Sequence, residues 1–201
     1  RLVSRLVTRE GAGDPAAQAR IAAAAEAEAA RLEAALRADR PALWVTYHCY
    51  YKAPDLLGPR LADALPLPYA IAEPSVSPRR REGPWAGFAR ASEAAIARAD
   101  RLFWTTARDR PALEAAGHGA RMVHLPAFLD PGQRVAPRPA RAAPRLLAVA
   151  MMRRGDKRES YRRLAAALAR LPGAWSLAVA GSGEAEAEVL ADLAPLGARL
   201  T

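Results

Sequence analysis

Short runs of β-forming residues alternate with helix-forming stretches along most of this 201-residue chain. Residues 14–39 begin with Asp14, a good helix cap, and Pro15, which suits a first turn, and then place apolar residues at three- and four-residue steps. Further helices are predicted at 87–99 and 110–116, and strands at 43–47, 69–72, 102–105 and 122–125. The first strand, LWVTY, is predicted to be buried. Repeated strand–helix order predicts an α/β fold in which helices cover a parallel sheet.

A segment rich in proline and arginine divides this pattern. Residues 131–144 read PGQRVAPRPARAAP, and because proline removes backbone donors, we expect a semi-rigid linker. Afterwards the pattern restarts, with strands predicted at 146–150 and 175–180 and helices at 158–170 and 184–194. The sequence therefore predicts a first domain over 1–130 and the start of a second over 145–201. One βαβ unit with a second helix leaves a sheet edge bare, so we expect the second domain to be truncated.

The net charge of +9 comes from 28 arginines and 2 lysines against 21 acidic residues. This excess favours binding of anions, although a solvated arginine surface is an equal alternative. No specific nucleic-acid partner is expected, because no helix-turn-helix, zinc finger or aromatic RNA-binding pattern is present. One cysteine and no metal-ligand spacing argue against a disulfide scaffold or a metal site, and no apolar run is long enough to span a bilayer.

The segment after the strand at 146–150 is the first candidate site. Arg153, Arg154 and Lys157 lie between this strand and the next helix, at the carboxyl edge where open α/β sheets bind ligands. Arginine can contact two phosphate oxygens at once, and lysine adds a compact charge. We predict an anion site, with a solvated basic loop as the alternative.

Gly181 and Gly183 follow the strand at 175–180 and are predicted to form a tight turn that brings the backbone close to a ligand. A dinucleotide site is excluded here, because the position of the third glycine holds Glu186 and neighbouring glutamates would repel a pyrophosphate.

Polar and aromatic residues also follow two strands of the first domain. His48, Lys52 and Asp55 come after the first strand, within the sequence TYHCYYKAPD, and Glu73 ends the second. Aromatic faces with His, Lys and Asp suit sugar binding, and a carboxylate at a sheet edge can bind hydroxyls or orient a reacting group. The alternative for each is a structural role in a turn.

The stretches IAEPSVS, EAAIARADRLFWTTARDRPALEAAG, MVHLPAFLD and RLLAVAMMRRGDKRESYRRLAAALARLPGAWSLAVAGSGEAEAEVL resemble family 4 glycosyltransferases, which are retaining enzymes of the GT-B fold. The resemblance covers most of the chain from about residue 40 and lies in the order and spacing of the motifs. It implies two Rossmann-like lobes, an acceptor on the first and a nucleotide-sugar donor on the second.

The resemblance also implies site roles. Arg153 or Arg154, with Lys157, would neutralise the donor diphosphate, with Gly181 and Gly183 in the donor-side turn. His48 and Glu73 would be the catalytic residues facing the acceptor and the transferred sugar, with Lys52 and Asp55 as acceptor-side candidates. No cofactor and no metal are implied.

Three departures from the family pattern stand out. Met152 replaces the usual glycine before the arginine, and Glu73 stands where the family often has histidine. The family's Gly-rich first loop would precede residue 1, and its pair of donor-binding glutamates would follow Thr201. We therefore expect the chain to be incomplete for activity.

The expected function is transfer of a sugar to a glycan, lipid or small-molecule acceptor by a bacterial, cytoplasmic enzyme, with peripheral contact at the inner membrane as an open possibility. Two alternatives remain: a non-catalytic Rossmann-like binding module and a sugar-nucleotide epimerase of the GT-B fold.

Overall fold

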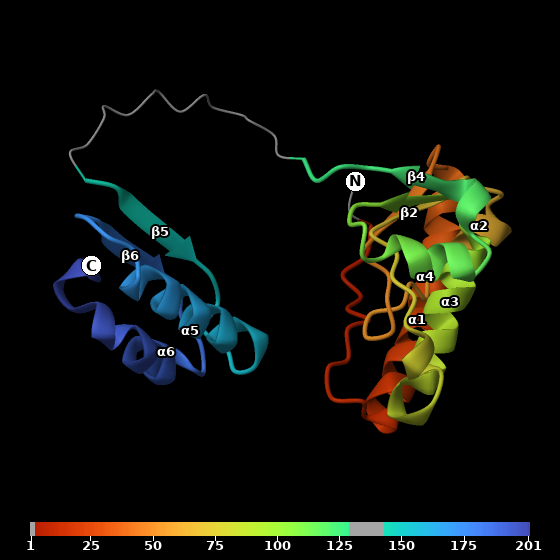
Figure 1. The fold of residues 1–201 in the computed structure, drawn as a ribbon. Helices are drawn as coiled ribbons and strands as arrows, with labels where there is room; N and C mark the ends of the chain where they lie inside the picture. The colour runs from red at the N-terminus through yellow and green to blue at the C-terminus, as the bar shows by residue number, and fades with distance from the viewer. Residues whose placement is uncertain (1–2, 129–142) are drawn as a thin grey trace. The chain divides into compact units, whose positions relative to one another are not determined.

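The computed structural model describes residues 3–128 and 143–201 (Figure 1). Contacts within the chain divide it into two compact units, residues 1–130 and 131–201, and each unit has its own hydrophobic core. The predicted linker lies outside the described residues except for Ala143 and Pro144. No helix within the described ranges is long and apolar enough to cross a membrane.

The first unit is a four-stranded parallel sheet with its helices. The strands lie in the order β1-β2-β3-β4, and every neighbouring pair is parallel, which confirms the predicted α/β fold. The elements, in chain order, are α1 (Pro15–Ala38), β1 (Trp44–Tyr47), α2 (Gly58–Ala64), β2 (Tyr69–Ala72), the 3-10 turns η1 (Pro78–Arg80) and η2 (Gly83–Trp85), α3 (Ala86–Arg98), β3 (Arg101–Trp104), α4 (Arg110–Ala115), η3 (Gly119–Arg121) and β4 (Met122–His124).

The long helix α1 begins as the sequence predicts. Asp14 accepts a hydrogen bond from the backbone N–H of Ala16 at 2.9 Å, which satisfies one of the free donors of the first turn. The predicted apolar face is buried at Ala25, Ala29, Leu32 and Leu36, where it joins a cluster with α2. The helix α2 is absent from the sequence prediction, because seven residues with a proline in the first turn are too short to show a helical period.

Among the described residues, helices cover one face of the first sheet and leave the other open. Tyr69, Ile71 and Leu102 point into the helix-packed core, whereas Val45 and Tyr47 on the opposite face are 59% and 73% exposed. The prediction that β1 is buried is therefore wrong. Its side chains alternate between the two faces, as in a strand with one solvated side, and β1 is also an edge of the sheet.

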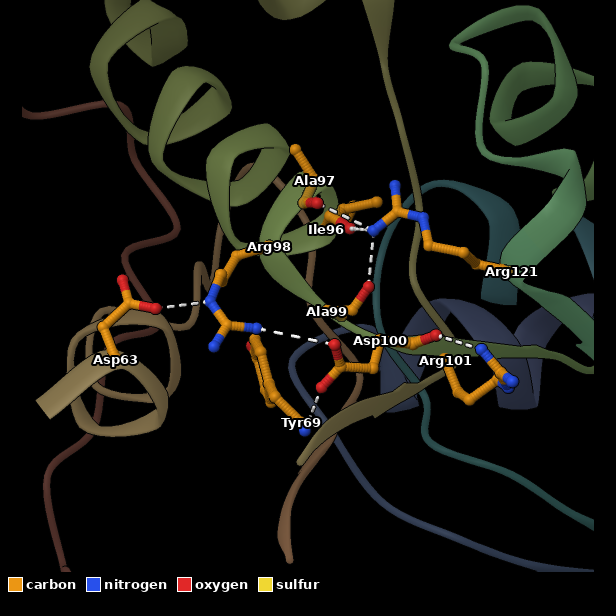
Figure 2. A network of polar contacts seen from close by, with 9 residues as sticks. All are labelled: Asp63, Tyr69, Ile96, Ala97, Arg98, Ala99, Asp100, Arg101 and Arg121. Atoms are coloured by element: carbon orange, nitrogen blue, oxygen red, sulfur yellow. Dashed lines mark hydrogen bonds and ion pairs between the residues drawn. The ribbon is translucent and has the colours of Figure 1, made fainter. Parts of the chain in front are cut away.

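The amino edge of this sheet is fixed by a polar network around the end of α3 (Figure 2). Asp100 accepts the backbone N–H of Tyr69 at 2.8 Å and lies 3.7 Å from the guanidinium of Arg98, which also bonds Asp63. The guanidinium of Arg121 donates to the last carbonyls of α3, which have no partner within the helix. The Ala-Asp end of this helix, one of the features behind the family resemblance, thus joins α3 to β2.

The second unit repeats this layering with two parallel strands. Its elements are β5 (Arg145–Val149), α5 (Asp156–Ala169), β6 (Ser176–Ala180), α6 (Glu186–Leu193) and the 3-10 segment η4 (Ala194–Arg199). Both helices lie on one face of the strands (Figure 1), where Tyr161, Leu168, Leu177 and Val189 form the core. On the other face, the β5 side chains of Leu147 and Val149 are 67% and 72% exposed.

Candidate functional site

In the first unit, three neighbouring strands end in one polar cluster. Tyr47 and His48 close β1, Glu73 follows β2, and Thr105 follows β3. The Glu73 carboxylate lies 3.4 Å from Nδ1 of His48 and accepts a hydrogen bond from the Thr105 hydroxyl at 3.1 Å. Tyr47 also hydrogen-bonds this carboxylate, and the negative charge of Glu73 raises the pKa of the Tyr47 phenol. The Glu73 side chain, at the end of β2, thus contacts residues at the ends of β1 and β3.

The backbone at this cluster has an uncommon conformation. His48 has φ of 64° and Glu73 has φ of 54°, in the left-handed region that favours glycine. Both residues are held there by the sheet, since the His48 N–H donates to Ala72 and the Glu73 N–H to Phe103, each at 2.8 Å. Such conformations cost about 1–3 kcal/mol each, and they concentrate at functional sites. Two such conformations at residues whose side chains contact each other therefore mark this strand edge as the candidate site.

The predicted site residues Lys52 and Asp55 have different surroundings from His48. Asp55 accepts hydrogen bonds from the hydroxyls of Thr46 and Tyr69 and from the backbone N–H groups of Leu57 and Gly58. These contacts fix the start of α2, so the carboxylate of Asp55 is used within the fold. Lys52 lies on a tight turn, with its Nζ 5.3 Å from the centre of the Trp85 ring.

A groove of about 330 Å³ lies beside His48, between residues 6–9 and the segment from Thr46 to Leu57. The nearby thiol of Cys49 is fully buried and contacts Ser92, and burial raises its pKa to about 11. A buried thiol with a raised pKa is a poor nucleophile, which indicates a structural role for Cys49. Within the described ranges, no group of three or more His, Cys, Asp or Glu side chains could hold a metal ion.

In the second unit, the basic residues after β5 fall into two groups. Arg154 pairs with Glu188 at 3.4 Å, and its backbone N–H bonds Glu184 at the same distance. Arg153 and Lys157 have no carboxylate partner among the described residues. Lys157 lines a hollow of about 270 Å³ between β5 and α5. Arg153 and Lys157 are therefore not neutralised by acidic side chains of the described residues, and the anion site at this loop stays a prediction.

Gly181 and Gly183 make a close approach, but the group they approach is the neighbouring backbone. A Cβ on Gly181 would lie 1.9 Å from the carbonyl oxygen of Ala150, and one on Gly183 would lie 2.2 Å from that of Met152. Hydrogen bonds from Met152 N to the Ser182 oxygen and from Ala185 N to the Met152 oxygen join the two loops. The glycines are explained by this contact between the loops after β5 and β6.

Thr105 was not identified from the sequence as part of the site. It follows a predicted strand, and a hydroxyl at a carboxyl edge is a usable signal once the strand order is known. The left-handed conformations of His48 and Glu73 carry no such signal, because neither residue is a glycine or asparagine.

No protein-family model matches the chain, and no curated protein matches it. Among solved structures, it is similar to the apo form of the lipopolysaccharide outer core galactosyltransferase WaaB, with a TM-score of 0.57 and 19% identity over 87% of this chain and 47% of that one. It is also similar to S. aureus MnaA in a co-structure with UDP, with a TM-score of 0.52 and 13% identity over 90% of this chain and 52% of that one.

The chain thus spans about half the length of both structures. The likeness establishes the fold, which is α/β and GT-B-like with Rossmann-like parallel sheets. At these identities the likeness shows the fold alone, and membership of glycosyltransferase family 4 stays a prediction.

Proposed function

We propose that this chain belongs to a glycosyltransferase that moves a sugar from a nucleoside diphosphate sugar to an acceptor with retention of configuration. The observation that carries the proposal is the Glu73–His48 pair, held on left-handed backbone at the carboxyl ends of β1 and β2. Ligands of open α/β sheets bind at this edge. The likeness to a galactosyltransferase and to a protein bound to UDP supports the substrate class.

The proposed donor site is the loop after β5. Arg153 and Lys157 would neutralise the donor diphosphate as the glycosidic bond breaks, since neither is compensated by a carboxylate among the described residues. Charge placed in advance where negative charge develops is an effective way to lower a barrier. Arg154 contributes less, because Glu188 and Glu184 already engage it. We propose that the reaction needs no metal and no cofactor.

The proposed acceptor site is the polar cluster of the first unit. Glu73 is oriented by Thr105 and His48, and its carboxylate can accept a hydrogen bond from an acceptor hydroxyl. His48 has 49% of its side chain exposed, so a sugar can contact its ring and its second nitrogen. These two residues would therefore position the acceptor rather than hold the donor diphosphate.

A thermal-shift series on the complete gene product tests the donor site. The ligands are UDP, UDP-glucose, UDP-galactose and GDP-mannose, with adenosine monophosphate as a mismatched nucleotide. A ligand that binds only the folded state at 100 times its Kd stabilises it by about 2.7 kcal/mol. We expect one nucleotide family to raise the transition temperature of the second unit, and an absence of any shift would refute the donor site.

Lys157→Ala is the matching variant, with Arg163→Ala on the exposed side of α5 as its control. In the complete gene product, Lys157→Ala should raise the barrier to sugar transfer by about 2–4 kcal/mol, which is roughly two to three orders of magnitude in rate. Its folding stability should hardly change, because a solvated lysine contributes little. Normal turnover by Lys157→Ala would show that its ammonium does not contact the donor phosphates.

The same turnover assay separates the alternatives. An epimerase would convert the sugar nucleotide without any acceptor, whereas a binding module would bind nucleotide and leave it unchanged. A transferase releases nucleoside diphosphate only in proportion to the sugar that appears on the acceptor.

A further inference from the structure

An aromatic row extends from the candidate site across the surface of the first unit. The ring of His48 lies 4.6 Å from that of Tyr50, Tyr50 lies 5.5 Å from Tyr51, and Tyr51 lies 5.3 Å from Trp85. The last two contacts are edge-to-face, a favourable arrangement for aromatic rings. These four rings, from His48 to Trp85, are called the aromatic row below.

The backbone under the aromatic row is well fixed. Tyr50 and Ala53 exchange two backbone hydrogen bonds, of 3.3 and 2.9 Å, so Tyr51 and Lys52 lie at the tip of a two-residue turn. The carbonyl of Lys52 accepts the N–H of Glu10 at 2.9 Å, which ties the turn to the N-terminal segment. Trp85 is buried, while Tyr50 and Tyr51 are half-buried. The row is therefore an anchored surface that keeps part of its aromatic area accessible.

Two cations lie over the far end of the row. The Nζ of Lys52 lies 5.3 Å from the Trp85 ring and 5.9 Å from the Tyr51 ring, and the guanidinium of Arg80 lies 5.1 Å from the Tyr51 ring. Such contacts are worth about 0.5–1 kcal/mol at exposed sites. They hold the cations in place without neutralising them, because an aromatic ring carries no net charge.

Two acidic residues of this region, Glu10 and Glu93, are already engaged elsewhere. Glu10 accepts hydrogen bonds from three successive backbone N–H groups, and Glu93 pairs with Arg81 at 3.0 Å. Within the described part of the chain, neither Lys52 nor Arg80 has a carboxylate partner. By contrast, ten arginines of the described residues pair with acidic side chains: Arg31, Arg37, Arg60, Arg81, Arg98, Arg110, Arg154, Arg158, Arg162 and Arg163.

We propose that the aromatic row binds an anionic saccharide, with the sugar ring against Tyr50 and Tyr51 and its carboxylate or phosphate between Lys52 and Arg80. This deepens the proposed function and rests on it, since it assigns the acceptor an acidic sugar. Small-ligand sites are typically lined by aromatic and other apolar side chains together with a few fixed polar groups. Because the row begins at His48, a saccharide lying on it would extend toward Glu73.

Ligand-observed NMR titrations of the 201-residue chain test the proposal without any nucleotide present. The probes are glucuronate and glucose 6-phosphate, each compared with glucose, and acetate and inorganic phosphate as anions without a sugar ring. We expect at least one acidic sugar to bind about tenfold more tightly than glucose at low salt, which corresponds to one charge-assisted contact. A preference for glucuronate identifies a carboxylate ligand, and one for glucose 6-phosphate a phosphate ligand.

Equal affinity for glucose and both acidic sugars would overturn the proposal, and so would inorganic phosphate or acetate binding as tightly as the matching sugar. Lys52→Met and Arg80→Met keep most of the side-chain length and should remove the tenfold preference while leaving weak glucose binding. Tyr51→Leu should weaken every sugar. The control is Arg101→Met, an exposed arginine at the amino end of β3, which should leave all affinities unchanged.

The outcome is independent of the donor site. If nucleotides fail to bind but the acidic sugar binds, the transferase proposal falls and the anionic site stands. If nucleotides bind and no acidic preference is found, a transferase with a neutral acceptor remains.

Discussion

In the first unit, the residues that directly follow β1 and β2 are His48 and Glu73. Both have positive φ, although neither is a glycine. In the second unit, positive φ in the loops after β5 and β6 occurs at the glycines Gly155 and Gly183. Both units share the same layering of a parallel sheet with helices on one face. They differ in how the carboxyl edge is built, and that is where open α/β sheets bind ligands.

The two edges solve different problems. In the second unit, glycines let the backbones of the loops after β5 and β6 pack against each other. The cations of this edge, Arg153 and Lys157, are carried on long side chains. In the first unit, the strained backbone at His48 and Glu73 brings their side chains into contact. Strain that is retained at a pair of interacting side chains indicates a function for those side chains, whereas glycine at such a position indicates a packing requirement.

The largest expected effect comes from adding one carbon at the second edge. In Gly181→Ala, the new Cβ would meet the Ala150 oxygen at 1.9 Å, so the two loops must separate and lose the hydrogen bonds between them. We expect the free energy of unfolding of the second unit to fall by about 3 kcal/mol or more. Urea titration read by hydrogen exchange in β5 and β6 measures this unit alone.

The control is Gly173→Ala, which has φ of 84° but open space around the new Cβ. It carries the conformational cost without the clash, and because alanine also restricts the unfolded chain, it should lose only about 0.5–1 kcal/mol. If both variants lost the same amount, close packing of the loops would not explain Gly181.

The next largest effect is a pH dependence of folding stability that we expect in the first unit. Burial raises the pKa of Cys49 from 9.0 to about 11, and burial also raises the pKa of Tyr69. Above pH 9 the unfolded chain releases these protons more readily than the folded one, so the stability of the first unit should fall as pH rises from 9 toward 11. The loss from Cys49 alone is about 2 kcal/mol by pH 11.

Unfolding curves at pH 8, 9.5 and 10.5, read by hydrogen exchange in β1 and β2, measure this loss. The second unit contains no cysteine, and it serves as the internal reference. In Cys49→Ala the part of the pH slope due to the thiol should disappear, even though the variant starts from a lower stability because of the cavity. An unchanged slope in this variant would assign the effect to Tyr69 or other groups.

The layers of this fold could be predicted because period and strand composition are local properties. β2 spans Tyr69–Ala72 as predicted, and α1 and α5 fall within two residues of their predicted bounds. The burial of β1 could not be predicted, because an apolar sequence such as WVTY does not show whether its second face is covered. The helix α2 is fixed by Asp55 from outside its own sequence, so its seven residues carry too little signal.

The candidate site was predictable in its composition but only partly in its geometry. The order of strands placed His48 and Glu73 at one edge, and the Glu73 carboxylate lies 3.4 Å from Nδ1 of His48. Asp55 looked equally suitable in sequence, yet its partners Thr46 and Tyr69 come from two strands and occupy it. The aromatic row depends on Trp85, which lies 34 positions after Tyr51, and no local pattern connects the two.

The smallest effect has the opposite sign to the first and tests the same comparison. Replacing His48 with glycine removes a left-handed strain of about 1–2 kcal/mol, against which the added freedom of the unfolded chain costs about 0.4–1 kcal/mol. The partly exposed contact with the Glu73 carboxylate contributes little. We therefore expect His48→Gly to stabilise the first unit by roughly 0.5–1 kcal/mol, although it should abolish sugar transfer in the complete gene product.

His48→Ala is the decisive partner variant, because it removes the same ring but keeps the Cβ and hence the strain. The difference in unfolding free energy between the glycine and alanine variants isolates the backbone term, and hydrogen exchange in β1 measures it in the first unit alone. Glu73→Gly and Glu73→Ala repeat the measurement at φ of 54°. If glycine gave no advantage over alanine at either position, the left-handed backbone would carry no stored strain. The difference between the carboxyl edges of the two sheets would then lie in the side-chain contacts of His48 and Glu73 alone, and not in their backbone conformation.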